Sequence, residues 1–102
     1  MTSRTSSTKP KKPKFLLGRV QGKSMLPTLK PGQLVFAIHK APKEGDLVIA
    51  MLLGREVIKR VKSISKDGYY LVGDNPDTSS DSRDYGAIKT EAIMAVVVWP
   101  RV

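Results

Sequence analysis

Short runs of apolar, largely β-branched residues, separated by Gly, Pro and Asp turn signals, constrain the fold of this sequence more than any other feature. Candidate strands lie at residues 16–20, 33–38, 46–53, 56–61, 69–72 and 93–99. None has the three- and four-residue apolar spacing of an amphipathic helix, and their Val and Ile content favours strands. The sequence therefore predicts a mostly β fold of short antiparallel strands and hairpins.

The connections between these runs have recognisable turn chemistry. Gly54 and Arg55 are predicted to form a two-residue hairpin turn with Gly first. Lys66-Asp67-Gly68 is predicted to form another turn. Residues 73–86 form a long polar stretch, and polar loops of this length in small domains are commonly functional.

The 102 residues allow one domain, and the first fourteen differ from the rest. Residues 1–14 contain no large apolar residue after Met1, so they cannot bury enough surface to offset the entropy of ordering them. We predict a disordered basic tail at 1–14 and a folded domain at 15–102. A domain of this size buries a modest core, to which a homodimer would add buried surface.

The net charge of +9 is concentrated near the start of the chain, where residues 1–23 hold seven Lys and Arg and no acid. Such a segment attracts nucleic acid or anionic membranes non-specifically. No aromatic residues alternate with these lysines to stack on bases, so we do not expect a nucleic-acid partner. No apolar stretch approaches the roughly 18–20 residues of a membrane span, and Cys is absent. We expect a cytoplasmic protein without a transmembrane anchor.

Ser24 and Lys59 are a candidate nucleophile and a candidate base. The sole histidine, His39, stands beside Lys40 in an expected loop, so we do not expect a histidine-based triad. A lysine acts as a base only when neutral, which at pH 7 costs about 4.6 kcal/mol for an ordinary amine. Burial can supply that free energy, and strand alternation places Lys59 between Val57 and Val61 on one face. Spacing alone leaves open an ordinary turn serine and an ordinary edge-strand lysine.

Four motifs together resemble the signal peptidase I family. Gly-Asp-Asn followed by Ser-x-Asp-Ser-Arg-x-x-Gly within residues 73–86 is similar to its signature loop. Ser-Met-x-Pro-Thr-Leu at 24–29 resembles its nucleophile motif, Gly-Asp-Leu-Val at 45–48 its Gly-Asp motif, and Lys-Arg at 59–60 its lysine motif. The ordered set is far more specific than any one motif, and it implies a small signal-peptidase-like β fold.

The resemblance implies a serine endopeptidase with a Ser/Lys dyad and no metal or other cofactor. Ser24 would be the nucleophile, Lys59 the general base, and Ser79 the residue that orients the lysine amine. Asp81 and Arg83 would form a structural ion pair. Met25 would line the pocket for small substrate side chains. Gly22 stands where bacterial relatives often have a serine that helps bind the oxyanion, so backbone N–H groups are expected in that role.

The sequence also departs from the family's pattern. The Gly-x-Pro-Gly-Asp continuation that usually follows the lysine motif is missing, and we expect neither the family's membrane anchors nor its large accessory domain. Short, soluble relatives that mature nickel-type superoxide dismutase resemble this chain in the Gly-Asp-Asn-Pro motif and in a valine-rich strand ending in Trp99-Pro100. This likeness implies removal of an N-terminal propeptide from the dismutase precursor, with nickel belonging to that substrate.

Three alternatives remain at this stage. A self-cleaving repressor-type peptidase would need an Ala-Gly or Cys-Gly bond upstream of Ser24, and residues 1–23 contain neither Ala nor Cys. A general signal peptidase I-like processing enzyme could be recruited to membranes by the basic tail. A non-catalytic nucleic-acid-binding β-domain would show salt-sensitive binding that depends on residues 1–14 and is indifferent to Ser24→Ala.

Overall fold

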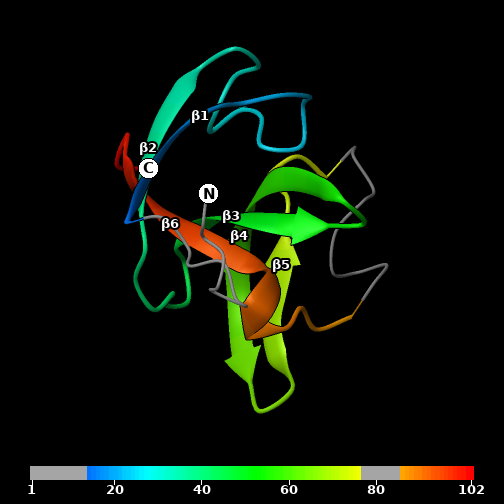
Figure 1. Cartoon of the computed structure of the whole chain (residues 1–102). Coiled ribbons are helices and arrows are strands. Elements are labelled where there is room, and N and C mark those ends of the chain that lie inside the picture. The colour runs from blue at the N-terminus through cyan, green and yellow to red at the C-terminus, as the bar shows by residue number, and fades with distance from the viewer. Residues whose placement is uncertain (1–13, 77–85) are drawn as a thin grey trace.

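The computed structural model describes residues 14–76 and 86–102. Within these ranges the elements are β1 (Phe15–Arg19), β2 (Leu34–Ile38), β3 (Leu47–Leu52), β4 (Arg55–Ser65), β5 (Gly68–Val72), the short 3₁₀ helix η2 (Thr90–Ala92) and β6 (Ile93–Trp99). The strands form one sheet in the order β1-β2-β6-β3-β4-β5, with every neighbouring pair antiparallel (Figure 1). The mostly β prediction is confirmed.

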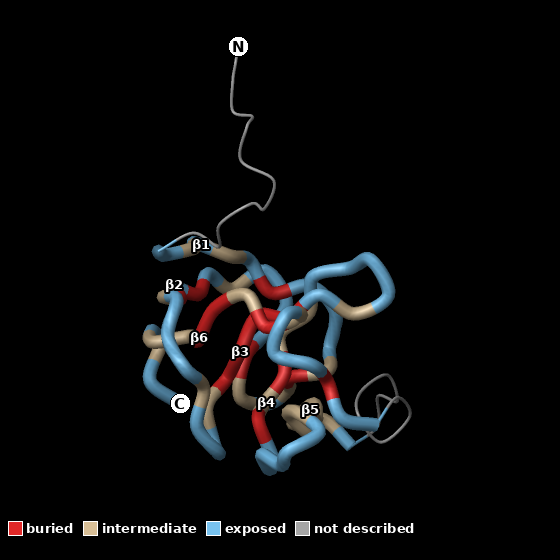
Figure 2. Tube along the Cα trace, turned by 60° about the horizontal axis from the view of Figure 1, so that its bottom comes forward, coloured by how far each residue is buried: buried red, intermediate tan, exposed pale blue. Residues whose placement is uncertain are grey.

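Strand β3 lies at the centre of the hydrophobic core because both of its faces are covered. Its residues alternate between two clusters, as the two-residue period of a strand requires. Leu47 and Ile49 belong to one cluster, whereas Val48 and Ala50 belong to the other. Figure 2 shows the buried segments following β3 and its neighbours. The first core cluster comprises Val20, Met25, Leu29, Val35, Ala37, Leu47, Ile49 and Ala95; the second comprises Val48, Ala50, Val61, Leu71, Ile88, Ile93 and Val96.

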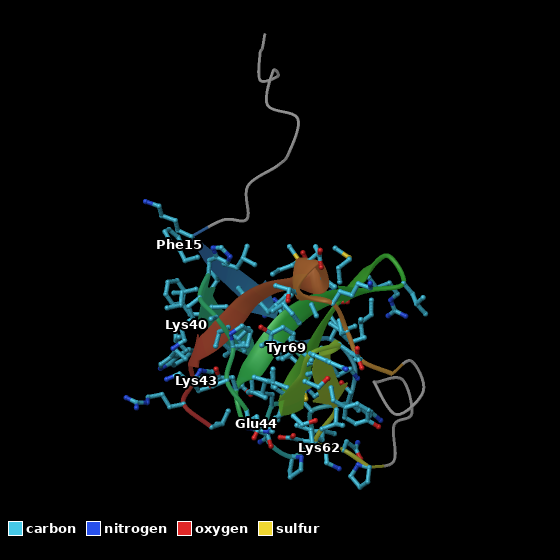
Figure 3. All side chains as sticks on the ribbon, turned by 90° about the horizontal axis from the view of Figure 1, so that it is seen from below. Phe15, Lys40, Lys43, Glu44, Lys62 and Tyr69 are labelled. Atoms are coloured by element: carbon cyan, nitrogen blue, oxygen red, sulfur yellow. The ribbon has the colours of Figure 1, made fainter. Side chains whose placement is uncertain are left out.

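The β1 side of the sheet is much less covered. Phe15, which lies at the margin of the molecule in Figure 3, is 62% exposed, and Leu17 on the same face is 68% exposed. The rings of Phe15 and Phe36 lie 5.7 Å apart between centroids. Apolar burial is therefore concentrated on the strands from β2 onward in the sheet, where Val35 and Ala37 of β2 are fully buried.

The hairpin turn predicted at Gly54 and Arg55 is wrong by one residue. Leu52 pairs with Arg55, so the two turn residues are Leu53 and Gly54. This register places Ile49 opposite Ile58 and Ala50 opposite Val57. The predicted turn would have placed Ile49 opposite Arg60 instead. The observed register also places Val48 opposite Lys59 and Leu47 opposite Arg60, so apolar pairing does not account for the one-residue difference.

The other predicted strands are found within one or two residues of their expected ends, except that β4 continues to Ser65. Because β4 lies between β3 and β5, Lys59 is not on an edge strand. The predicted basic tail falls almost wholly outside the described residues, with only Lys14 inside them. In the described part of the chain, no helix has the length and apolar content needed to cross a membrane.

Candidate active site

Ser24 lies in the connection between β1 and β2, at the start of a single helical turn. The backbone N–H of Leu29 donates to the carbonyl oxygen of Met25 at 2.9 Å and closes this turn. The side chains of Met25 and Leu29 are almost fully buried in the first core cluster. Two apolar anchors therefore fix the turn, and partly buried Ser24 precedes them.

The segment after β5 packs directly against the backbone of Ser24. A Cβ atom on Gly73 would lie 2.7 Å from the Ser24 carbonyl oxygen and 3.3 Å from the Ser24 Cβ, so no side chain fits there. The backbone N–H of Asn75 donates to the same carbonyl at 2.8 Å. The Asn75 side-chain amide donates to the carbonyl of Lys23 at 2.9 Å. Gly73 and Asn75 thus hold Ser24 from one side.

Lys59 is 3% exposed and is the one charged residue that is buried among those the structure describes. It pairs with Val48 on β3. On its other side Arg60 pairs with Val72, so continuing that register by one residue places Lys59 opposite Gly73. Cross-strand partners point to the same face of an antiparallel sheet. Ser24 therefore occupies the space over Gly73, on the face toward which the Lys59 side chain points.

Arg60, the neighbour of Lys59, connects three of the four sequence motifs. Its Nε and Nη2 each donate to a different oxygen of the Asp74 carboxylate at 2.9 Å, and its Nη1 donates to the carbonyl of Gly45 at 2.7 Å. The hydroxyl of Thr28, in the turn that follows Ser24, donates to Asp74 Oδ2. Asp74 therefore joins the turn that begins with Ser24 to the strand that carries Lys59.

The contacts between Arg60, Asp74 and Thr28 favour the charged forms of Asp74 and Arg60. Hydrogen bonds from Arg60 hold the pKa of the Asp74 carboxyl below its usual value, and the Thr28 hydroxyl acts in the same direction against the opposing effect of burial. The pKa of Arg60 is raised, first by its hydrogen bond with Asp74. Both side chains are largely shielded from water, with exposed fractions of 25% for Arg60 and 15% for Asp74. A bidentate pair in this setting is oriented as well as strong.

A cleft of about 530 Å³ opens beside Ser24. One wall comes from the end of β1 and the residues after it, and the opposite wall from the start of β4. Its lining residues include Gly22, Ser24, Met25, Ile49, Glu56 and Val57. Ser24, Gly22 and Met25, which the sequence placed in one site, therefore border one cavity.

Three of the predicted site residues are not described by the structure, and two residues that join the site were not predicted. Ser79, Asp81 and Arg83 lie outside the described residues. Asp74 and Thr28 stood inside recognised motifs but received no role. The sequence feature that could have indicated the role of Asp74 is its position directly after Gly73, at the end of a predicted strand, together with an arginine next to Lys59.

No group of three or more His, Cys, Asp or Glu side chains that could hold a metal ion occurs among the described residues. The described site contains a serine hydroxyl, a lysine amine and the Arg60–Asp74 ion pair. The expected absence of a cofactor remains a prediction.

One comparison with known proteins identifies a family for this chain. A search of curated proteins found no match to the chain. The family model described as Peptidase S24-like matches residues 2–98, which include the Ser24, Gly-Asp, Lys59 and 73–86 motifs. The chain therefore belongs to the Peptidase S24-like family.

Proposed function

We propose that the protein is a serine endopeptidase in which Ser24 attacks the substrate and Lys59 acts as the general base. Family membership supports a serine peptidase-type hydrolase. The observation that carries the dyad is the position of Ser24 over Gly73, across the sheet ladder from buried Lys59. A hydroxyl nucleophile needs a neighbouring base, and a serine–lysine pair is an established form of that arrangement.

Burial supports the proposed role of Lys59 as the base. An ammonium ion loses hydration when it is buried, so an apolar setting favours the neutral amine. The residues around Lys59 provide such a setting, because its cross-strand partner Val48 and its same-face neighbour Val61 are both in the core. Activity is expected to rise with pH as the Lys59 amine loses its proton.

The proposed reaction is acyl transfer in two stages. Ser24 Oγ forms a bond to the scissile carbonyl carbon while its proton passes to Lys59 Nζ. The tetrahedral intermediate then breaks its C–N bond, and the Lys59 ammonium protonates the departing amine. Water attacks the acyl-enzyme, gives a proton to Lys59, and the C–Oγ bond breaks as Lys59 returns that proton to Ser24.

The oxyanion of each tetrahedral intermediate needs hydrogen-bond donors. Because Gly22 has no side chain, we assign this role to backbone N–H groups that include the N–H of Ser24 itself. The cleft lined by Met25 and Gly22 is the proposed site for the substrate residues next to the scissile bond. Ser79 remains the proposed partner that orients the Lys59 amine, and Asp81 and Arg83 remain the proposed ion pair of that loop.

The proposed substrate is a nickel-type superoxide dismutase precursor that carries an N-terminal propeptide. The support is the resemblance of the motifs at residues 73–86 and at Trp99-Pro100 to those of maturation proteases. A general signal peptidase-like processing activity is the alternative. A homodimer and a cytoplasmic location also stay predictions, which sedimentation velocity and cell fractionation would test.

The decisive experiment incubates the purified protein with unprocessed dismutase precursor and determines the new N-terminus by mass spectrometry. Ser24→Ala and Lys59→Ala are expected to abolish cleavage, and thermal unfolding shows whether each variant keeps its fold. Lys59→Met serves as a variant that fills the same buried space. Ser63→Ala and Lys62→Ala, at exposed positions of β4, are matched controls that should cleave normally. Substantial turnover by both dyad variants would refute the proposal.

A further inference from the structure

The turn between β3 and β4 contains a residue poorly suited to it. Leu53 has a φ of 52°, and it is the only non-glycine residue with positive φ among those the structure describes. Gly54, the second turn residue, has a φ of 77°. A two-residue turn with both positions in the left-handed region favours Asn, Asp or Gly at the first position. A leucine there stores conformational strain.

Burial does not compensate for this strain within the described fold, because Leu53 is 79% exposed. The exposure of the apolar Leu53 side chain and the strain of its backbone both lower the stability of the fold. Strained residues concentrate at functional sites, where the strain serves an interaction. Leu53 is therefore a candidate for contact with another molecule.

The turn is continuous with the cleft beside Ser24. Met51 pairs with Glu56, which lines the cleft, and strand alternation places Met51 on the same face as Ile49, another lining residue. Met51 is itself 39% exposed. The turn at the end of β3 lies at the margin of the molecule in Figure 1. The cleft wall thus continues outward through Met51 to Leu53.

We propose that Met51 and Leu53 form a contact for the substrate polypeptide outside the cleft, an inference that rests on the proposed function. The occupant is the part of the substrate chain that leaves the cleft past Glu56. The surface formed by Met51 and Leu53 would bind an apolar side chain, because neither residue offers a strong hydrogen-bond donor or acceptor. It favours substrates with an apolar residue beyond the segment that the cleft holds.

The test separates this contact from the chemistry by comparing two substrates. One is the full dismutase precursor; the other is a short peptide limited to the residues that flank the scissile bond. Leu53→Asn suits the turn and should raise the melting temperature. It should lower kcat/KM for the precursor about tenfold, through lost apolar contact, and leave kcat/KM for the short peptide unchanged.

Leu53→Met is the conservative variant and should retain most precursor cleavage. Ile64→Thr removes another exposed apolar side chain, at the far end of β4, and should cleave both substrates as the unsubstituted protein does. Equal precursor cleavage by Leu53→Asn and the unsubstituted protein would overturn the inference and leave the peptidase intact. Failure of the unsubstituted protein to cut either substrate would overturn the proposed function and this inference with it.

Discussion

Arg60 and Asp74 form a bidentate ion pair, with Nε and Nη2 of the guanidinium each 2.9 Å from a carboxylate oxygen. Arg60 is adjacent to Lys59 in β4, and Asp74 is adjacent to Gly73, which contacts Ser24. The pair therefore fixes the strand of the proposed base relative to the segment that holds the proposed nucleophile. Several consequences of that link can be measured.

Removing either partner of the pair should disturb the site without removing a reacting group. We expect Arg60→Gln and Asp74→Asn each to lower the free energy of unfolding by about 1–3 kcal/mol, because the remaining partner loses a hydrogen bond in a shielded position. Proteolytic kcat should fall about tenfold through misplacement of Lys59 and Ser24. Urea unfolding and steady-state kinetics measure the two effects.

The double variant distinguishes a direct interaction from two separate defects. Because the residues contact each other, the combined loss of Arg60→Gln with Asp74→Asn should be smaller than the sum of the single losses. Lys62→Gln, at an exposed position of the same strand, is the matched control and should stay within about 0.5 kcal/mol of the unsubstituted protein. Strict additivity would contradict the proposed coupling.

The pH dependence of stability follows from the lowered pKa of Asp74. A carboxyl whose pKa is lower in the folded state stabilises the fold fully above its unfolded pKa, near 3.9. That contribution is lost as the pH falls through the folded pKa. The stability advantage of the unsubstituted protein over Asp74→Asn should therefore be constant near neutral pH and shrink below about pH 4–5. Chemical denaturation across this range checks it; a difference that grows on acidification would show the opposite sign.

Gly73→Ala tests the contact with Ser24 directly. The added Cβ would lie 2.7 Å from the Ser24 carbonyl oxygen, closer than real Cβ atoms approach backbone, so Ser24 and the Gly73 segment must move apart. A displacement of about 1 Å at the reacting atoms can cost roughly 10²-fold in rate. Cleavage assays on the folded variant should show such a loss. Gly32→Ala, which strains a positive φ but meets no atom within 4 Å, should lose stability with much less effect on kcat.

Local pattern was enough to locate the strands because β-branched runs and turn residues act over a few positions. The strand at 93–99 was predicted with the bounds that β6 has. The β3–β4 turn was misassigned because Gly54-Arg55 has the residue preference of a two-residue turn with Gly first, whereas the observed turn places Leu53 at a positive φ. The structure pairs Leu52 with Arg55, and a linear sequence does not display such cross-strand pairs.

The sequence motifs predicted the residues of the candidate site but not the contacts between them. Ser24 and Lys59 were named from residue chemistry and resemblance, but the sequence did not predict that Gly73 lies beside Ser24 and in register with Lys59. The role of Asp74 was missed because its partners, Thr28 and Arg60, are 46 and 14 residues away. Contacts of that separation depend on the sheet order, which local signals do not encode.

Thr28→Val separates the hydroxyl contribution from that of the ion pair. Valine has nearly the same shape as threonine but cannot donate to Asp74 Oδ2, so Asp74 keeps Arg60 and loses one hydrogen bond. Since the Thr28 bond helps to lower the Asp74 pKa and ranks below the Arg60 bond, its removal should raise that pKa less than Arg60→Gln does. The onset of acid destabilisation should therefore shift to higher pH in the order unsubstituted protein, Thr28→Val, Arg60→Gln. Carboxyl titration by NMR gives the Asp74 midpoint in each protein, and an unchanged midpoint in Thr28→Val would contradict a hydrogen bond from this hydroxyl.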